Sequence, residues 1–577
     1  MRRLLPLLEN LGWLASCLPP TLAFVTALSW PERCQRRLLR RMLARLPATR
    51  YGRERGVGSS MRTAEEFLQV PMADYESLRP FIRAIQAGEP NVLAAEPVTV
   101  LQPTSGTSAA PKLIPFTRGL QRQFQDALAP WMVSLFSRHP RLLFGRQYWC
   151  VSPNTRPRAE SQSAVPVGFM EDTDYLGGWQ RRIARHLLVA PDGLTRVEDP
   201  AAFEFLTLLF LVREENIRLV SVWHPSFLTV LLEALPGHAA ALEACLRSGQ
   251  LPAGLALPGD VRSLLSGRLR PDPDRAGAMA RMNLTKPAEV RRLWPHLQVI
   301  SCWTGRGAET CVARLREWFP GVTIEGKGLM ATEGVVTIPW GLDGRFVCAV
   351  RSHFLEFLEP DSVCAKRCWE LEPGKSYSVV MTTAGGLWRY RLGDLVRVAG
   401  WAGRTPCLEF VRREGSVSDI CGEKLTLADA EAALDQARAA TGMGFSFAML
   451  VPERQGTEAG YDLLVQLPPD TPPASLEKLA NVVDTALHVN FHYLHARRLG
   501  QLRPARVRVI RGDADRQYRA HLLKLGARHG DVKYPVLRIE MGWPAAFEIE
   551  ARTGDSWLRP RASSDPSLGR SPELMTD

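Results

Sequence analysis

Apolar and polar positions alternate along this chain with two periods, that of a buried strand and that of an amphipathic helix. Between residues 118 and 326, short apolar runs alternate with longer segments whose apolar positions have helical spacing. Strand, helix, strand, helix at these intervals predicts a largely parallel sheet with helices on both faces. The strands are expected at 147–152, 217–222, 297–303 and 322–326, and the helices at 118–137, 200–212, 225–235 and 308–319.

The pattern changes between Val335 and Val411, where short strand-like runs are separated by turn residues such as Gly341. Such runs predict antiparallel strands, and they are expected at 345–350, 353–358, 376–383, 387–398 and 407–411. A polar stretch at 412–424 follows and is a candidate hinge. Beyond it the pattern predicts a smaller α+β unit with helices at 426–440 and 474–494 and strands at 444–451, 461–467, 505–510 and 536–540.

The first 30 residues are largely apolar, but Glu9 and Asn10 interrupt them early, and Pro19-Pro20 are expected to break the middle. No uninterrupted apolar run of about 18–20 residues exists, so packing helices are predicted here and not a spanning helix. Residues 31–50 carry leucines at helical spacing among arginines, which predicts a helix with a cationic opposite face. This apolar, arginine-flanked pattern leaves a peripheral membrane contact open as an alternative.

Composition places the chain among ordinary globular proteins, with 45% hydrophobic and 23% charged residues in 577. The net charge of +12 is spread along the chain. A generally basic surface that attracts anionic substrates explains this charge better than nucleic-acid binding does. The 11 cysteines are scattered without a CxxC pair. This predicts reduced thiols in a cytoplasmic protein and argues against a disulfide framework or a zinc finger.

Residues Thr104 to Pro115, TSGTSAAPKLIP, are the most suggestive chemical feature. A short apolar strand precedes them, and two Thr, two Ser and one Gly fall within five residues. Such a turn can present backbone N–H groups and hydroxyls to a tetrahedral anion, with Lys112 as a compact positive charge. Taken alone, the stretch also fits a surface Ser/Thr-rich loop.

Three later stretches have a similar character. In Ala331-Thr332-Glu333-Gly334, a hydroxyl beside a carboxylate at a strand's end suits a phosphate contact and a magnesium ligand, although a plain glycine turn is the alternative. In WRYRLGD at 388–394, Asp394 could accept hydrogen bonds from ribose hydroxyls and an arginine could answer anionic charge. An exposed strand end with an ion pair fits it equally. The fourth stretch, CGEKL at 421–425, is only a weak indication of function when taken alone.

In this order, the four motifs resemble the auxin-responsive Gretchen Hagen family of acyl acid amido synthetases, within the acyl-adenylate-forming superfamily. The resemblance covers roughly residues 50 to 545. It includes PMADY at 71–75 and SVWHPSF at 221–227. It implies an α/β fold with a large N-terminal adenylate-forming domain, built from a parallel sheet and a β-barrel-like subdomain, and a small α+β C-terminal domain. The implied domains are 51–412 and 416–548, with a helical segment at 1–50 packed on the large domain and a disordered tail at 552–577.

The resemblance also implies roles for individual residues. The ATP phosphates would be held by Ser105, Gly106, Thr107, Ser108 and Lys112. Thr332 would contact the α-phosphate and carboxylate, Glu333 would bind Mg²⁺, Asp394 would bind the ribose, and Arg413 would lie at the hinge. The C-terminal catalytic lysine would be Lys533, with Lys424 as the rival.

Two departures from the family pattern stand out. Ala109 and Ala110 replace glycines that many relatives carry, which stiffens the loop. His353-Phe354-Leu355-Glu356-Phe357 only approximates the family's aromatic-Phe-Glu-Phe pattern.

The implied function is an ATP-dependent ligase that activates a small carboxylic acid as acyl-AMP and transfers the acyl group to an amino acid. The expected cofactors are ATP and Mg²⁺, and the expected partners are the two substrates, without nucleic acid. Two alternatives remain at this point: thioester formation with coenzyme A through the same acyl-AMP, and a non-catalytic membrane-peripheral binding protein. A kinase-type phosphate loop is disfavoured because GxxxxGK[ST] is missing from the sequence.

Overall fold

The structure is a computed structural model that describes residues 4–57, 61, 63–104, 112–150, 163–168, 183, 186–305, 308–360, 362, 364–414, 417–455, 458–468, 471–525, 532 and 534–550. The chain forms two compact units. The first unit comprises Met1–Val417, Thr426–Ala428 and Arg519–Val536, and the second comprises Ser418–Leu425, Asp429–Tyr518 and Leu537–Asp577.

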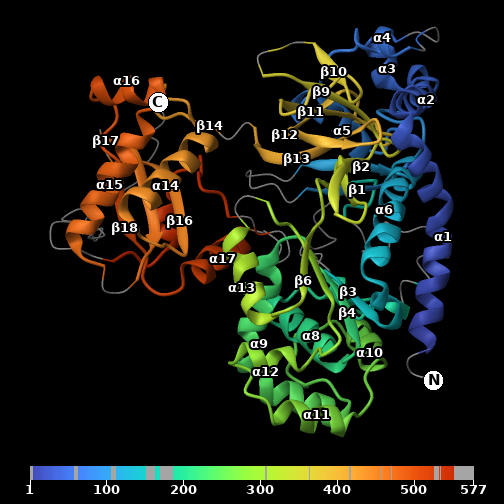
Figure 1. Ribbon diagram of the computed structural model, residues 1–577, viewed down its shortest axis with the longest axis vertical. Coiled ribbons are helices and arrows are strands. Elements are labelled where there is room, and N and C mark those ends of the chain that lie inside the picture. Colours follow the sequence, from blue (N-terminus) through green and yellow to red (C-terminus); the bar gives the residue numbers. More distant parts are fainter. Residues whose placement is uncertain are drawn as a thin grey trace, which may run out of the picture. The chain divides into compact units, whose positions relative to one another are not determined.

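A parallel sheet lies in one half of the first unit, with its strands in the order β3-β4-β5-β6. These strands are β3 (Arg146–Trp149), β4 (Ile217–Ser221), β5 (Val299–Cys302) and β6 (Thr323–Gly326). Helices surround them (Figure 1): α8 (Pro200–Arg213), α9 (Pro225–Ser248), α10 (Gly259–Ser266), α11 (Pro273–Ala280), α12 (Pro287–Arg291) and α13 (Glu309–Trp318). The predicted parallel sheet with covered faces is therefore confirmed.

The other half of the first unit is built on an antiparallel sheet with the strand order β10-β9-β11-β12-β13-β8-β7. Its strands are β7 (Thr337–Trp340), β8 (Arg345–Cys348), β9 (Phe354–Leu358), β10 (Ala365–Arg367), β11 (Ser376–Thr382), β12 (Tyr390–Ala402) and β13 (Thr405–Arg413). All five residues of β9 are buried, so this strand lies in the core of the sheet.

Local sequence signals set the ends of several helices. Thr117 caps α6 (Arg118–Arg138) by accepting a hydrogen bond from Leu120 N–H. Asp199 caps α8, whose first residue is Pro200. Asp74 and Ser77 form a capping box at the start of α5 (Tyr75–Gln86).

The short elements of the first unit connect these larger parts. They are η1 (Leu46–Ala48), α3 (Arg50–Glu54), α4 (Ala64–Phe67), η2 (Pro140–Phe144) and η5 (Leu194–Arg196), together with the antiparallel pair β1 (Val98–Pro103) and β2 (Leu113–Thr117). The serine- and threonine-rich stretch at 105–111 joins β1 to β2 and lies outside the described residues.

The expected break at Pro19-Pro20 is wrong, because a single helix, α1 (Leu4–Ser29), contains both prolines. A proline inside a helix costs about 3 kcal/mol, so other interactions must stabilise this conformation. Trp13, Cys17 and Phe24 are buried along one side of α1 and supply that packing. A second helix, α2 (Pro31–Leu43), follows after Trp30.

By length and composition alone, two helices of the described residues are long and apolar enough to cross a membrane: Leu5–Ser29 and Pro225–Ser248. The second is α9, which buries Phe227, Leu231 and Leu235 against its neighbours as a core helix does. The first is α1, whose buried side packs on α6 (Figure 1).

The second unit combines an antiparallel pair with one parallel neighbour, in the order β16-β17-β18. Its main elements are α14 (Leu427–Thr441), β16 (Phe447–Gln455), β17 (Glu458–Gln466), α15 (Pro473–Leu487), α16 (Phe491–Arg498), β18 (Arg506–Val509) and η7 (Trp543–Ala546). Helix α17 (Ala514–Lys524) begins in this unit, and the short pair β14 (Val417–Ser418) and β15 (Leu425–Thr426) precedes it in the chain.

Two predicted elements of this region differ from the structure. The helix expected over 474–494 is interrupted by a turn that separates α15 from α16, where Asn490 caps the second helix. The strand expected at 536–540 is reduced to one bridge, between Leu450 and Leu537. Predicted strand boundaries elsewhere agree with the structure to within four residues.

Candidate functional site

A tight turn presents Thr332 and Glu333. Ala331 and Gly334 exchange both backbone hydrogen bonds, with N···O distances of 2.9 and 3.2 Å, and Met330 bridges to Val335. The two residues between them are therefore held at the tip of the turn, shortly after β6. Glu333 is buried, with 5% of its surface exposed, and Thr332 is half-buried.

Gly334 is required by the packing behind this turn. A Cβ atom at Gly334 would lie 2.6 Å from His353 Nε2 and 2.8 Å from Met381 Sδ, both closer than real contacts allow. His353 is fully buried, donates one hydrogen bond from Nδ1 to Gln123 Oε1 at 3.1 Å, and has its pKa lowered to about 3 by burial. The imidazole is therefore neutral at physiological pH and acts as a rigid support for the turn.

Tyr390 links the turn to the second motif. Burial raises the pKa of Tyr390, the negative charge of Glu333 raises it further, and the positive charge of Arg413 opposes the shift. Charges more than about 10 Å away would be largely screened, so Glu333 and Arg413 lie in the electrostatic neighbourhood of the Tyr390 hydroxyl. Two of the predicted site residues are thus brought together from segments about 80 residues apart.

Asp394 and Arg413 face each other across β12 and β13, where they are register partners. Arg413 Nη1 lies 3.7 Å from Asp394 Oδ1, and the Asp394 side chain is 6% exposed whereas that of Arg413 is 46% exposed. A buried carboxylate beside a half-exposed guanidinium can accept hydroxyl hydrogen bonds while its charge is balanced.

Arg389 is a structural residue, which differs from the expectation that an arginine of this run answers substrate charge. Its guanidinium is buried and pairs with both carboxylate oxygens of Glu356, at 2.9 and 3.1 Å. It also donates to the carbonyl oxygens of Leu68 and Val70. Arg391 is exposed and is the arginine of the run that remains accessible.

The PMADY segment is joined to the same motif by backbone hydrogen bonds. Ala73 N–H donates to Arg389 O at 3.0 Å, and Arg391 N–H donates to Ala73 O at 2.8 Å. Ala73 and Tyr390 consequently form a parallel bridge. This contact carries the next residues, Asp74 and Tyr75, to the Tyr390 hydroxyl, whose pKa both raise slightly.

Tyr75 in turn positions Lys112 at the start of β2. The Tyr75 hydroxyl accepts a hydrogen bond from Leu113 N–H at 2.8 Å, and Lys112 Nζ lies 5.6 Å from the centre of the Tyr75 ring. A hydrogen bond from Ser77 N–H lowers the pKa of Asp74, and the charge of Lys112 adds to this shift. Lys112, Glu333, Asp394 and Arg413 are therefore grouped around Tyr75 and Tyr390 within the first unit.

The remaining predicted site residues are those at 105–108, Lys424 and Lys533. Ser105, Gly106, Thr107, Ser108 and Lys533 lie outside the described residues. Lys424 belongs to the second unit, is exposed and has a left-handed backbone with φ of 46°. Its neighbour Glu423 is fully buried and accepts hydrogen bonds from the backbone N–H groups of Ile420 and Cys421, so this glutamate stabilises the turn.

Lys327 is a charged residue near the turn that the sequence did not single out. It follows β6, is 6% exposed, and donates a hydrogen bond from Nζ to Ser221 Oγ at the end of β4 at 2.5 Å. Its ammonium lies 5.3 and 5.1 Å from the ring centres of Trp131 and Trp223. A lysine between two glycines is normally exposed, so nothing in the local sequence indicates that Lys327 is buried.

His224 caps a helix and is not poised for chemistry. Its Nδ1 accepts a hydrogen bond from Ser226 N–H at 3.2 Å and lies 2.7 Å from Ser226 Oγ at the start of α9. Its ring packs 5.6 Å from that of Tyr534, centre to centre. Tyr534 is the residue that follows Lys533, so the segment with the candidate lysine contacts the carboxyl end of β4 through its described neighbour.

Within the part of the chain that the structure describes, no cluster of three or more His, Cys, Asp or Glu side chains could hold a metal ion by itself. Mg²⁺ in phosphate-transferring sites takes one or two carboxylates and completes its octahedron with phosphate oxygens and water. The single buried carboxylate of Glu333 fits that pattern, because the nucleotide would supply the other ligands.

Comparison with known proteins identifies the family. The sequence matches the GH3 family N-terminal domain over residues 23–324, the GH3 family central domain over 346–413 and the GH3 family C-terminal domain over 428–539. The chain belongs to the GH3 family. The expected family, named above as Gretchen Hagen, is thereby confirmed.

Curated relatives of this GH3 chain are plant amido synthetases. A probable indole-3-acetic acid-amido synthetase of Oryza sativa subsp. japonica, GH3.12, is 24% identical over 87% of the chain and 90% of its own length. Jasmonoyl–L-amino acid synthetase GH3.5 of the same plant is 23% identical over 87% of the chain and 91% of its length. Their names agree with the predicted enzyme class, an acyl acid amido synthetase.

A solved structure supports the fold. The GH3.15 acyl acid amido synthetase superimposes with a TM-score of 0.75 at 20% identity, covering 91% of this chain and 94% of the other. The expected fold class, α/β with a parallel sheet, a β-barrel-like subdomain and a small α+β C-terminal part, is therefore confirmed, and the seven-stranded antiparallel sheet is the β-barrel-like part.

Proposed function

We propose that this GH3 chain uses ATP to activate a carboxylic acid as an acyl-adenylate and then transfers the acyl group to an amino acid. The observation that carries the proposal is the grouping of Lys112, Glu333, Asp394 and Arg413 around Tyr75 and Tyr390. Three of these residues come from three separate motifs, Arg413 is the last residue of β13, and the fold brings all four to one region of the first unit. Family membership supplies the reaction class.

In the first step, a carboxylate oxygen attacks the α-phosphorus of ATP and pyrophosphate leaves with the electron pair of the broken P–O bond. Positioning and electrostatic stabilisation supply most of the acceleration in such transfers. Lys112, with Ser105, Gly106, Thr107 and Ser108, would hold the phosphates. Thr332 would orient the α-phosphate and the carboxylate from the tip of the turn. Asp394 would accept hydrogen bonds from the ribose hydroxyls.

Glu333 would bind Mg²⁺ together with phosphate oxygens. The metal would neutralise phosphate charge as pyrophosphate departs. The burial of Glu333 supports this role, because a buried carboxylate without a cation would be costly. Arg413, at the end of the antiparallel sheet and just before the second unit begins, would serve as the hinge residue.

In the second step, the amino group of an amino acid attacks the acyl carbonyl and AMP leaves as the amide forms, with a proton released from the nitrogen. A lysine of the C-terminal region would assist the first step and withdraw for the second, which is a gating motion. We assign Lys533 to this role, with Lys424 as the second candidate.

An ATP–pyrophosphate exchange screen over a panel of carboxylic acids tests the proposal. Exchange that depends on one class of carboxylic acid is expected. If well-folded protein shows no acid-dependent exchange, the proposed adenylation step is wrong. Adding amino acids or coenzyme A to the exchanging system then identifies the acceptor. Amide formation is expected, whereas thioester formation would assign the chain to a different second step.

Variants connect the activity to the site. Asp394→Asn and Lys112→Ala should each raise the KM for ATP or lower kcat by about 10- to 100-fold, since each removes a charged contact worth about 1.5–3 kcal/mol. Asp274→Asn and Lys286→Ala are matched controls on exposed residues of the first unit and should leave exchange unchanged. Equal effects in both sets would mean that the grouped residues do not bind the nucleotide.

The substrates are the proposed partners, and a cytoplasmic location is proposed with them. None of the 11 cysteines, all of which are described residues, forms a disulfide, and this agrees with a reducing compartment.

A further inference from the structure

Helix α1 has an uncovered apolar face opposite its packed one. Large apolar side chains recur along it at intervals of three, four and seven residues, and between 46% and 66% of each is exposed: Leu5, Leu8, Leu11, Leu18, Leu22 and Val25. Ala15 and Ser29 lie in the same stripe. The single charged residue of the helix is Glu9, which is outside the stripe. A stripe of this length without charge is unusual on a surface that faces only water.

The other face of α1 fixes the helix to the first unit. Asn10 is fully buried, donates to the carbonyl oxygens of Leu143 and Gly145, and accepts from Gln147 Nε2, all at 3.0 Å. At the far end, Leu28 O accepts from Arg404 N–H at 2.8 Å and from Thr405 Oγ1 at 3.1 Å. Both ends are thus bonded to the core, so α1 cannot leave it to cross a membrane without breaking these contacts.

Helix α2, which follows α1 directly after Trp30, carries a row of exposed arginines. Arg33, Arg37 and Arg40 recur at intervals of four and three residues and are all exposed, while Gln35 and Leu39 of the same helix are buried. The spacing places the three guanidinium groups on one side of α2. Ion pairs of the described residues engage the neighbouring Arg36, with Glu32 and Glu65, but none of these three arginines.

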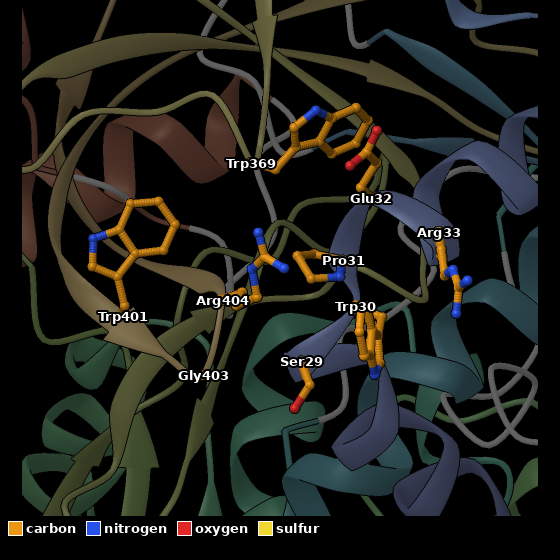
Figure 2. Close-up of a pocket in the computed structure, with 9 residues that line it drawn as sticks. All are labelled: Ser29, Trp30, Pro31, Glu32, Arg33, Trp369, Trp401, Gly403 and Arg404. Atoms are coloured by element: carbon orange, nitrogen blue, oxygen red, sulfur yellow. The ribbon is translucent and has the colours of Figure 1, made fainter.

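Trp30 lies at the junction between the apolar and the cationic surfaces. It is 51% exposed, and the Arg33 guanidinium lies 5.1 Å from its ring centre. Both residues line a pocket of about 410 Å³ together with Trp369, Trp401 and Arg404 (Figure 2). Tryptophan beside arginine, next to an apolar surface, is the side-chain combination of the membrane–water interface.

We propose that the outer face of α1, with Trp30 and the arginines of α2, is a docking surface for an anionic lipid bilayer. The leucines enter the acyl boundary, Trp30 lies at the level of the glycerol and headgroups, and Arg33, Arg37 and Arg40 contact lipid phosphates and carboxylates. The protein lies on the bilayer without spanning it.

Charge complementarity selects this partner over a second copy of the chain. A second copy could cover the leucines, but its own net charge is +12 and it would leave both sets of arginines without anionic partners. An anionic bilayer covers the apolar stripe and supplies negative charge beside it in the same layer. The proposal does not depend on the ligase activity, because every residue of the surface lies outside the proposed catalytic group.

Vesicle co-sedimentation with the full chain tests the proposal. Vesicles of phosphatidylcholine containing about one-third phosphatidylserine should sediment the protein at about 0.1 M NaCl, and binding should weaken strongly at about 0.5 M NaCl. Vesicles of phosphatidylcholine alone should bind much less.

Two triple variants separate the apolar and the cationic contributions. Leu11→Gln with Leu18→Gln and Leu22→Gln, and Arg33→Gln with Arg37→Gln and Arg40→Gln, should each weaken binding on the order of 100-fold, about fivefold per residue. The matched control, Arg268→Gln with Arg270→Gln and Arg281→Gln, removes the same charge from exposed positions of the first unit and should retain most of the binding. Circular dichroism and thermal unfolding verify that all three remain folded.

Three results would overturn the proposal. One is failure of the folded parent chain to sediment with phosphatidylserine vesicles. Another is equal weakening in the control triple and the α2 triple, which would reduce the effect to overall charge. The third is a stable dimer in light scattering that the leucine triple converts to monomer, which would assign the α1 face to a second copy.

Discussion

Arg389 and Glu356 form a two-point ion pair inside the antiparallel sheet of the first unit. Arg389 Nε and Nη2 lie 3.1 and 2.9 Å from the two carboxylate oxygens, and the side chains are 5% and 1% exposed. Arg389 also has a left-handed backbone, with φ of 46°, which costs an L-residue about 1–2 kcal/mol. The pair therefore holds in place Arg389, the residue just before the Tyr390–Asp394 motif.

Removing one partner of this pair should destabilise the first unit severely. Glu356→Gln leaves a buried guanidinium without its counter-charge, and such a loss typically costs about 3–5 kcal/mol. Denaturant unfolding of the purified variant measures this cost. The control is Glu409→Gln, which breaks an exposed pair with Arg397 at 2.8 Å and should cost less than about 1 kcal/mol. A similar decrease in the free energy of unfolding in both variants would mean that burial does not determine how strongly the Arg389–Glu356 pair stabilises the protein.

Gly334→Ala should impair catalysis through the position of the Thr332–Glu333 turn. The new Cβ would come within 2.6 Å of His353 Nε2, so the turn must move away from its support. A shift of this kind should lower acid-dependent pyrophosphate exchange by about 100-fold, since misplacement by about 1 Å costs that much in positioned reactions.

Gly237→Ala is the control for this substitution. Gly237 lies inside α9 and a Cβ there meets nothing within 4 Å, so alanine should be neutral or stabilise the helix by up to about 1 kcal/mol. Unchanged exchange in Gly334→Ala would show that the turn does not need its observed position.

The parallel sheet and the helix caps could be predicted from sequence because their signals are local. Thr117, Asp74 and Asp199 each precede an apolar-periodic segment, and a capping side chain acts within three residues. The site residues Lys112, Glu333 and Asp394 were predicted from motifs, yet their grouping rests on contacts between distant segments. Tyr75 and the Ala73–Tyr390 bridge, which create that grouping, carry no local signal of their role.

Local sequence preference was misleading or silent where tertiary packing determines the structure. Pro19-Pro20 indicates a helix end, but the buried face of α1 stabilises one continuous helix. Lys327 is charged and flanked by glycines, so only the packing of Trp131 and Trp223 makes it a buried residue. Glu356 and Arg389 are 33 residues apart, and their pairing follows from the strand order of the antiparallel sheet.

Tyr75 should affect ATP binding in two separable ways. Tyr75→Phe removes the hydroxyl that accepts from Leu113 N–H but keeps the ring beside the Lys112 ammonium. Tyr75→Leu removes both. The KM for ATP in pyrophosphate exchange should rise about fivefold in the first variant and further in the second, since one hydrogen bond and one cation–π contact are each worth about 1 kcal/mol. Equal KM values for ATP in the two variants would mean that the Tyr75 ring does not contribute to ATP binding.

Lys327 should make stability rise at alkaline pH. Burial lowers its pKa to about 8 from an ordinary value of 10.5. Below pH 8 the lysine is charged in both the folded and the unfolded chain, and the folded chain carries the cost of the buried charge. Between those two values the unfolded chain holds a proton that the folded chain has lost, so the free energy of unfolding rises with pH. The full gain is on the order of 3 kcal/mol.

Lys327→Met removes this pH dependence, and urea unfolding at pH 7 and pH 9.5 measures it. Methionine has similar length and no charge, so the variant should be more stable than the parent at pH 7, and that advantage should shrink at pH 9.5 because the parent gains stability there. Lys286→Met replaces an exposed lysine, and its free energy of unfolding should stay within about 0.5 kcal/mol of the parent at both pH values. Other titrating groups cancel in the comparison between variants. A constant difference between Lys327→Met and the parent across this range would show that the Lys327 ammonium is not held at a desolvation cost between the two tryptophans.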